Sequence, residues 1–216
     1  ILSGLVGSEM CIRDSFIGLK NKTTNLSFYG SQSLPKKHNH IIFRFKNFKL
    51  IYNDPRRFGF LKILKNKSDY IRFFARIGPE AISKDFNKKY LSQILKNRTK
   101  NIKNLLLDQK LVSGLGNIYV NEILFQAKIN PFKKSYLINL EESKRIVKYS
   151  KIILKKAIHF GGSSIRDFKG ITGKSGNFQS EFKVYDRAKK RCSRNNCSGQ
   201  ISRKIISNLS LIHISE

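Results

Sequence analysis

The sequence predicts an α+β protein, because strand-like and helix-like hydrophobic patterns occupy separate parts of the chain. Apolar and polar residues alternate across residues 41–52, which is the period of a half-buried strand. Beyond residue 80 the apolar spacing changes to three and four, the period of amphipathic helices. With 216 residues, of which 40% are hydrophobic, the chain can bury a core and is not a disordered basic tail.

The strand-like part begins with a predicted hairpin. Its turn is expected at Lys46-Asn47, because Asn tolerates a positive φ and apolar alternation continues on both sides. A third strand is expected over residues 59–64. A further short strand is predicted much later, over residues 182–185, beyond the helices.

The helical part is predicted from apolar spacing together with capping signals. The first helix covers residues 86–95 with Ser83 as a plausible N-cap, and the second follows Thr99 as a possible cap. A third begins at Asn117 and ends before Pro131.

The fourth predicted helix has the clearest signals at both ends. Asn139 and Glu142 have the spacing of a capping box, and the pair Gly161-Gly162 would end the helix. A stretch rich in Gly, Ser and Lys follows over residues 161–176.

The charge of the chain indicates a polyanionic partner. There are 43 Lys and Arg against 14 Asp and Glu, a net charge of +29, spread along the sequence. Nucleic acid is the first candidate. A membrane surface is the second, but no basic amphipathic helix lies beside an apolar anchor and no apolar run approaches the ~18 residues of a span. An AT-rich genome would raise Lys, Asn and Ile, but it would not make acidic residues this scarce.

The two ends of the sequence differ from the rest. Residues 1–15 and 209–216 resemble translated sequencing-adapter read-through, so they are left out of the fold prediction. A signal peptide is rejected because the first stretch has neither a basic start nor a continuous apolar segment. Without Cys11, the chain retains Cys192 and Cys197, and in an intracellular chain such a pair suggests a metal site before a disulfide.

Three motifs could carry chemistry, and each has an ordinary structural alternative. Residues 111–119, LVSGLGNIY, place glycines before a helix start, which suits phosphate binding but also fits an ordinary helix connection. Residues 54–59, DPRRFG, could grip phosphates and wedge into a base stack, or could be a surface turn in which Asp54 pairs with an Arg. Cys192 and Cys197 could bind zinc, but a closed site needs four ligands, so free thiols are the alternative.

The order of these motifs resembles that of bacterial formamidopyrimidine-DNA glycosylases, which remove oxidised purines from DNA. The resemblance covers residues 34–208 and rests on the stretches Lys37–His40, Asn53–Gly59, Ile77–Phe86, Leu107–Phe125, Ile129–Pro131, Gly161–Phe168 and Phe182–Arg187. It implies a β-sandwich over residues 16–80, a helix-two-turn-helix domain over residues 81–176 and a zinc-finger β-hairpin over residues 177–208. In this family the DNA crosses a cleft between the two halves, and the target nucleotide is flipped out.

The resemblance also implies roles for individual residues. His38 and Arg56 would contact phosphates around the lesion, and Arg56 and Phe58 would fill the gap left by the flipped nucleotide. The other implied DNA-binding residues are Arg57, Arg98, Lys103 and Asn117. Residues 163–174 correspond to the loop that closes over the flipped base. The family binds one zinc ion through four cysteines, of which Cys192 and Cys197 are present here.

The departures from the family pattern are as informative as the matches. The family's N-terminal proline nucleophile, its neighbouring glutamate, its catalytic lysine, the arginine of the hairpin tip and the second cysteine pair have no match in this sequence. Residues 17–28 do not match the family's Met-bearing strand. We therefore expect an internal fragment of the enzyme, with a truncated sandwich and an incomplete finger, that is catalytically inactive.

The expected partner is double-stranded DNA containing oxidised purines or abasic sites. The parent protein would be a monomer in the bacterial cytoplasm, near the nucleoid, without a membrane partner. Two alternatives stay open: an endonuclease VIII-type glycosylase for oxidised pyrimidines, and a non-catalytic basic nucleic-acid-binding protein such as a ribosomal component.

Overall fold

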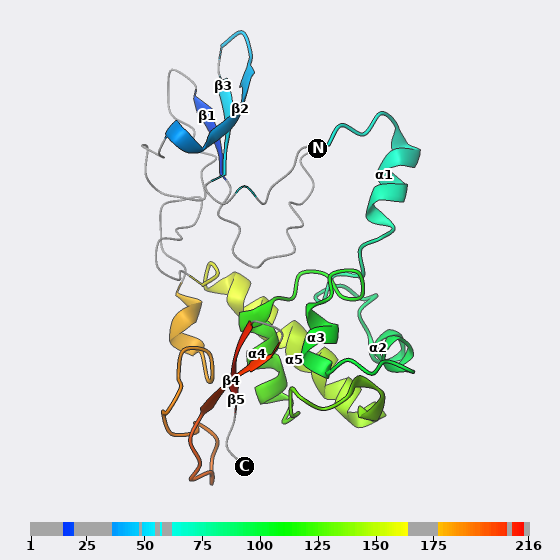
Figure 1. Cartoon of the computed structure of the whole chain (residues 1–216), viewed down its shortest axis with the longest axis vertical. Helices are drawn as coiled ribbons and strands as arrows, with labels where there is room; N and C mark the ends of the chain where they lie inside the picture. The colour runs from blue at the N-terminus through cyan, green and yellow to red at the C-terminus, as the bar shows by residue number, and fades with distance from the viewer. Residues whose placement is uncertain are drawn as a thin grey trace. The chain divides into compact units, whose positions relative to one another are not determined.

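The structure is a computed structural model that describes residues 15–19, 36–47, 49–54, 57, 62–163, 177–206 and 209–213. It divides into two compact units (Figure 1). Of the described residues, those within 11–63 and 157–181 make up the sheet unit, and those within 64–156 and 182–216 make up the helical unit. The domain boundaries expected from the sequence stay a prediction.

The sheet unit contains a hairpin that follows a short 3-10 helix, Lys36–His38. Strand β2, Asn39–Arg44, pairs antiparallel with β3, Lys49–Asn53, and a bend at residues 46–47 confirms the predicted turn. A third strand, β1 (Ser15–Leu19), pairs with the other edge of β3, so the strand order is β1-β3-β2. The sequence did not predict β1.

The strand expected over residues 59–64 is not found where the structure can be described. Residues 58–61 lie outside the described residues, and residues 62–65 have no regular secondary structure.

The helical unit is built from α1 to α5. The helices are α1 Lys67–Phe74, α2 Lys88–Leu95, α3 Ile102–Leu107, α4 Asn117–Gln126 and α5 Leu140–His159, with short 3-10 helices at Ser135–Leu137 and Phe178–Glu181. The last residues of α5 and the second 3-10 helix belong to the sheet unit. A two-stranded sheet, β4 Ser202–Ile206 and β5 Leu209–His213, completes the helical unit. The core of this unit is apolar and includes the fully buried Leu91, Leu105, Leu106, Ile123 and Ile146.

Asparagine side chains cap α1, α2, α3 and α5. The predicted caps Ser83 and Thr99 are wrong: α2 begins after Asn87, whose Oδ1 accepts from the Tyr90 N–H at 3.0 Å, and α3 begins after Asn101. An N-cap oxygen must reach an amide two or three residues ahead, and these asparagines are the residues at that distance. Helix α1, which the sequence analysis did not predict, is capped in the same way by Asn66.

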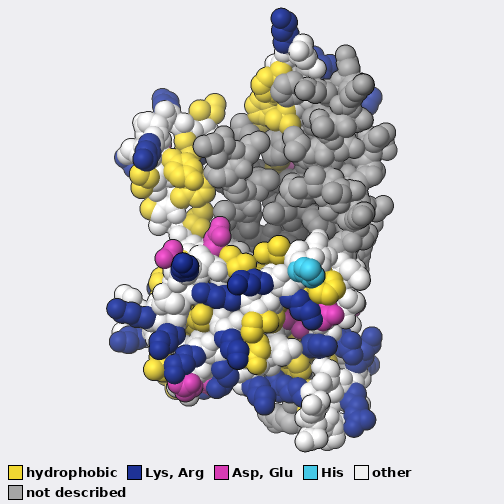
Figure 2. Space-filling view, turned by 180° about the vertical axis from the view of Figure 1, so that it is seen from behind, with side chains coloured by type: hydrophobic (Ala, Val, Ile, Leu, Met, Phe, Trp, Pro, Cys, Tyr) yellow, Lys and Arg dark blue, Asp and Glu magenta, His cyan; other side chains and the backbone are white. Residues whose placement is uncertain are grey.

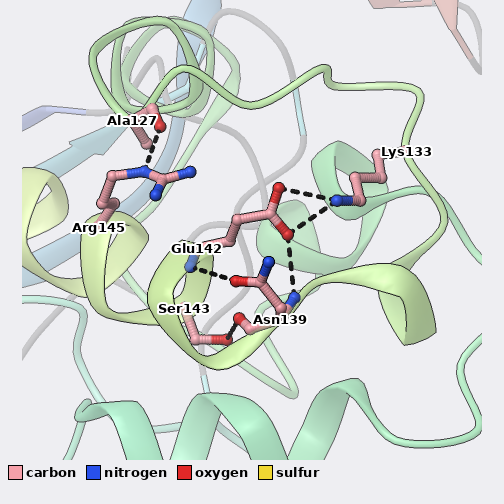
Figure 3. A network of polar contacts seen from close by, with 6 residues as sticks. All are labelled: Ala127, Lys133, Asn139, Glu142, Ser143 and Arg145. Atoms are coloured by element: carbon pink, nitrogen blue, oxygen red, sulfur yellow. Dashed lines mark hydrogen bonds and ion pairs between the residues drawn. The ribbon is translucent and has the colours of Figure 1, made fainter.

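The predicted capping box of α5 is confirmed (Figure 3). Asn139 Oδ1 accepts from the Glu142 N–H at 2.8 Å, and Glu142 Oε2 accepts from the Asn139 N–H at 2.9 Å. Lys133 Nζ donates to both oxygens of the same carboxylate, at 2.7 and 2.8 Å. At the other end, Gly161 and Gly162 have φ angles of 72° and 83°, which end the helix as predicted.

None of the helices in the described part of the chain has both the length and the apolar character needed to cross a membrane.

Candidate nucleic-acid interface

The turn between α3 and α4 ends in a helix start that no side chain caps. Gly114 has a φ of +78°, and Gly116 occupies the N-cap position of α4 in an extended conformation. Because Gly116 has no side chain, α4 lacks the N-cap hydrogen bond that an asparagine side chain makes at the start of α1, α2, α3 and α5. Asn117, at the first helical position, is partly exposed. A helix start of this kind can bind an external anion such as phosphate.

Gln109 connects the two sides of this turn. Its Oε1 accepts from the Gly114 N–H at 2.9 Å, while its Nε2 donates to the carbonyls of Leu115 at 2.7 Å and Leu107 at 3.3 Å. The partly exposed amide therefore bonds the end of α3 and the residues just before α4.

The segment before the helices lies along the same turn. Gly78 N–H donates to the Gln109 carbonyl at 2.9 Å, and Ser113 N–H donates to the Pro79 carbonyl at 3.0 Å. A Cβ on Gly78 would lie 2.3 Å from the Leu111 carbonyl carbon, so only glycine fits there. The Ile77-Gly78-Pro79-Glu80 motif thus bonds the backbone of the turn at Gln109 and Ser113.

Arg98 and Lys103 differ in their exposure. Arg98 is exposed between α2 and α3, where it can reach an anion. The Lys103 side chain has no solvent exposure, and burial lowers the pKa of Lys103 to about 8. Phosphate contact by Lys103, which would require its ammonium group to meet the ligand, stays a prediction.

The basic surface is broader than these residues alone. Figure 2 shows Lys and Arg side chains distributed over the visible face of the helical unit, with few Asp and Glu side chains among them. Such a face favours a polyanion without selecting a sequence.

In the sheet unit, two residues of the DPRRFG motif are described, and a buried carboxylate joins them. Asp54 Oδ1 accepts from the backbone N–H of Arg57 at 2.8 Å, and Arg57 has a φ of 56°. The Arg57 side chain is exposed. His38 is partly exposed, and its carbonyl accepts from the Asp54 N–H. Arg56 and Phe58 lie outside the described residues.

The finger segment, residues 182–201, is attached to α4. The predicted strand over residues 182–185 is wrong, because a side chain takes the amides that a neighbouring strand would bind. Glu122 accepts from the backbone N–H groups of Lys183, Val184 and Tyr185 at 2.9, 3.0 and 2.8 Å. Burial raises the pKa of Glu122, although the three amides and the nearby Lys183 charge oppose that shift.

A second contact joins the finger segment to the end of α4. Arg194 donates to the Phe125 carbonyl at 2.5 Å, and its guanidinium lies 4.3 Å from the centre of the Phe125 ring. Phe125 packs in a small apolar core with Val184, Cys192 and Ile201.

The two cysteines of the finger segment do not form a disulfide. Cys192 is buried, and Cys197 packs partly buried against the same apolar core. Among the described residues, no group of three or more His, Cys, Asp or Glu side chains is placed to hold a metal ion. These residues therefore do not form the closed shell that a structural zinc site needs.

Relatives of known name match most of the chain. Formamidopyrimidine-DNA glycosylase of Roseobacter denitrificans is 40% identical over 191 residues, covering 88% of this chain and 68% of the relative. The enzyme of Ruegeria pomeroyi is 37% identical over 210 residues, covering 94% and 74%. The formamidopyrimidine-DNA glycosylase H2TH domain family matches residues 77–169. The chain belongs to the formamidopyrimidine-DNA glycosylase family. It spans only 58% of a third relative, from a Wolbachia of Drosophila simulans.

Solved structures of the glycosylase family share the fold. Lactococcus lactis Fpg in complex with DNA containing an abasic site is similar with a TM-score of 0.77 and 32% identity, over 94% of this chain and 70% of that one. A variant of the same enzyme in complex with DNA containing Fapy-dG is similar to the same degree, at 31% identity. The family resemblance read from the sequence motifs and the mixed α+β fold are confirmed.

The sequence analysis did not single out three residues that organise the helical unit: Gln109, Glu122 and Arg194. Glu122 offered a signal, because it is the one charged residue in the helix sequence NIYVNEILFQ. Gln109 and Arg194 offered none, since the contacts of Gln109 form only in the folded turn and the Arg194 contact joins residues 69 positions apart.

Proposed function

We propose that this chain is the DNA-binding part of a base-excision repair enzyme that removes oxidised purines and cleaves the resulting abasic site. One observation carries the proposal: the only helix from α1 to α5 without a side-chain cap begins at the glycine turn of the family's helix-two-turn-helix domain. Relatives with the same fold bind damaged DNA, as their structures' names state.

The proposed contact is electrostatic and independent of base sequence. The first amides of α4 and the Asn117 side chain would bind a backbone phosphate, aided by the positive end of the helix dipole. Arg98 would add a cation in the same unit, and Lys103 would contribute if its ammonium reaches the ligand. Because phosphate contacts position a protein without reading bases, this site would hold the duplex in register.

The sheet unit supplies the proposed lesion contacts. His38 and Arg56 would bind phosphates near the lesion, and Arg56 and Phe58 would also occupy the space left by the flipped nucleotide. Arg57 would be a further DNA-binding residue. The proposal rests here on the family motif, with the bond between Asp54 and the Arg57 backbone as support. We assign the Schiff-base chemistry to the family's proline amine, which has no match in the printed sequence.

The proposal also includes the family's zinc ion, the oligomeric state of the protein and its location in the cell. Cys192 and Cys197 would supply two of the four zinc ligands, and no step of DNA binding is assigned to the metal. We expect a monomer in the bacterial cytoplasm, because the relatives are bacterial enzymes that work on DNA.

Binding of labelled duplexes, measured by fluorescence anisotropy across a salt series, tests the proposal. About four to six phosphate contacts predict a log–log salt slope of roughly −4 to −5. Asn117→Ala should weaken binding to every duplex, whereas Lys148→Ala, on exposed α5 surface, should have a much smaller effect. Equal effects of the two variants would leave only diffuse charge attraction. No preference for an abasic-site duplex over intact duplex would favour a non-catalytic nucleic-acid-binding protein.

A further inference from the structure

We propose that Gln109 is a positioning residue that holds the α3–α4 turn in the shape needed to present the α4 amides to a phosphate. The inference rests on the proposed DNA-binding function. It adds a residue that touches no DNA itself but determines where the phosphate-binding groups lie.

The Gln109 side chain has the chemistry that this turn needs. The acceptor oxygen is bonded to Gly114 N–H at 2.9 Å, and the NH₂ group is bonded to the Leu115 carbonyl at 2.7 Å and, more weakly, to Leu107. A carboxamide provides both an acceptor and donors in one plane. A carboxylate, a hydrocarbon chain or an ammonium group would lose at least one of these bonds.

The groups bonded by Gln109 lie directly before the start of α4. Gly114 and Leu115 are the last residues before the N-cap Gly116, and Gly114 has a left-handed φ of +78°. Apart from its two chain neighbours, no heavy atom lies within 4 Å of a Cβ built on Gly114, so this side of the turn faces open space. The Gln109 bonds therefore restrain the reversal that determines the direction of the first α4 amides.

The Gln109 backbone is itself bonded to the Ile77–Ala81 segment. Its carbonyl accepts from Gly78 N–H at 2.9 Å. The same segment continues with the Pro79–Ser113 bond and the Ala81 N–H, which donates to the Ser113 carbonyl at 3.0 Å. Gln109 is thus bonded to the Ile77–Ala81 segment through its backbone and to the glycine turn through its side chain.

The experiment combines two Gln109 variants of the full 216-residue chain with Asn117→Ala. Gln109→Leu removes all three side-chain bonds. Gln109→Glu has the same shape and keeps the acceptor for Gly114, but it opposes a carboxylate oxygen to the Leu115 carbonyl. Gln93→Glu, on the exposed surface of α2, controls for the added charge.

The readouts are affinity for an abasic-site duplex at fixed salt and hydrogen exchange of the Gly114 amide measured by NMR. Gln109→Leu should weaken DNA binding about tenfold. Adding Asn117→Ala to Gln109→Leu should weaken binding only slightly further, because the effects of coupled residues on binding free energy are not additive. The Gly114 amide should exchange faster in Gln109→Leu and stay protected in Gln109→Glu, which should also bind DNA more weakly than Gln93→Glu does.

Two results would overturn the inference, and they can be told apart. If Asn117→Ala weakens binding but both Gln109 variants bind like the wild type, or if the effects of Gln109→Leu and Asn117→Ala multiply, Gln109 does not position the site while the proposed function stands. If Asn117→Ala has no effect, the phosphate site itself is wrong and both proposals fail. A folding defect of Gln109→Leu does not block the test, because Gln109→Glu retains the Gly114 bond.

Discussion

Replacing Glu122 with glutamine is expected to loosen the finger segment from α4. The carboxylate uses both oxygens: Oε1 accepts from Val184 and Tyr185, and Oε2 accepts from Lys183. In Glu122→Gln one of these positions becomes an NH₂ group, which faces a backbone N–H donor. Either orientation of the amide therefore loses at least one bond and places two donors together.

The size of the effect follows from the three bonds and the cost of burial. A hydrogen bond to a charged group contributes about 1.5–3 kcal/mol and a neutral one about 1 kcal/mol. The variant loses one bond and weakens two. It also no longer buries a charge, a cost seen in the raised pKa of Glu122. The net loss in docking free energy should be about 2 kcal/mol, and Glu122→Ala, which leaves three amides without this acceptor, should lose about 3 kcal/mol.

Hydrogen exchange resolves this local change from global unfolding. The amides of residues 183–185 should exchange about 30-fold faster in Glu122→Gln, while amides of the buried α5 residues Ile146 and Ile153 should be unaffected. Glu141→Gln, which changes an exposed carboxylate bonded to Lys144, is the matched control. Unchanged protection of residues 183–185 in Glu122→Gln would refute the assigned role.

The raised pKa of Glu122 also predicts a pH dependence. A carboxyl whose folded pKa lies above its unfolded value contributes stability that is present below the unfolded pKa and lost as pH rises through the folded pKa. The free energy of unfolding should therefore contain a contribution from Glu122 that falls as pH rises from about 4 through the raised pKa, measured by urea unfolding across a pH series. Glu122→Gln should not show this contribution. Identical pH dependence of unfolding in the wild type and in Glu122→Gln would contradict the prediction.

Three further predictions concern the rest of the helical unit. Because burial lowers the pKa of Lys103 to about 8, the free energy of unfolding should fall as pH decreases from about 10 to that value, and DNA affinity should rise as pH decreases through it. Neither trend should appear in Lys103→Gln, measured by thermal unfolding and by fluorescence anisotropy. Gly78→Ala should lower the free energy of unfolding in urea by about 2–3 kcal/mol, because its Cβ would meet the Leu111 backbone. Burial would raise the pKa of Glu142, but the bond from Lys133 and the other contacts of this carboxylate lower it overall. The free energy of unfolding should therefore fall more in the wild type than in Glu142→Gln as pH falls through that lowered pKa, measured by circular dichroism.

Features encoded by nearby residues could be predicted from the sequence. Helix α5 was predicted with its capping box and its glycine end because each signal acts within one or two turns. The β2–β3 hairpin and the start of α4 at Asn117 were predicted for the same reason. Caps were misplaced at Ser83 and Thr99, because several polar residues precede each helix and only the chain path decides which one caps.

Features that depend on distant parts of the chain could not be predicted. Residues 182–185 have a strand-like pattern, but their amides bond a side chain 61 to 63 positions earlier in the sequence. Helix α1 buries none of its residues, so its apolar pattern carried little information. For the site, the glycines and Asn117 were recognisable, whereas the role of Gln109 depends on contacts five and six residues ahead that exist only in the folded turn.

Helix α4 connects the two functional features of the helical unit. Its first residue, Asn117, belongs to the proposed phosphate site, while Glu122 and Phe125 hold the finger segment about one to two turns later. Seven of its ten residues are buried, so the helix itself cannot shift without disturbing the core. A change at one end should therefore leave the other end intact. Glu122→Gln should weaken docking of the finger segment and still bind duplex DNA through Asn117, whereas Asn117→Ala should weaken DNA binding and keep residues 183–185 protected. If either variant produced both defects, α4 would have to move as a whole, and the separate roles assigned to its two ends would be wrong.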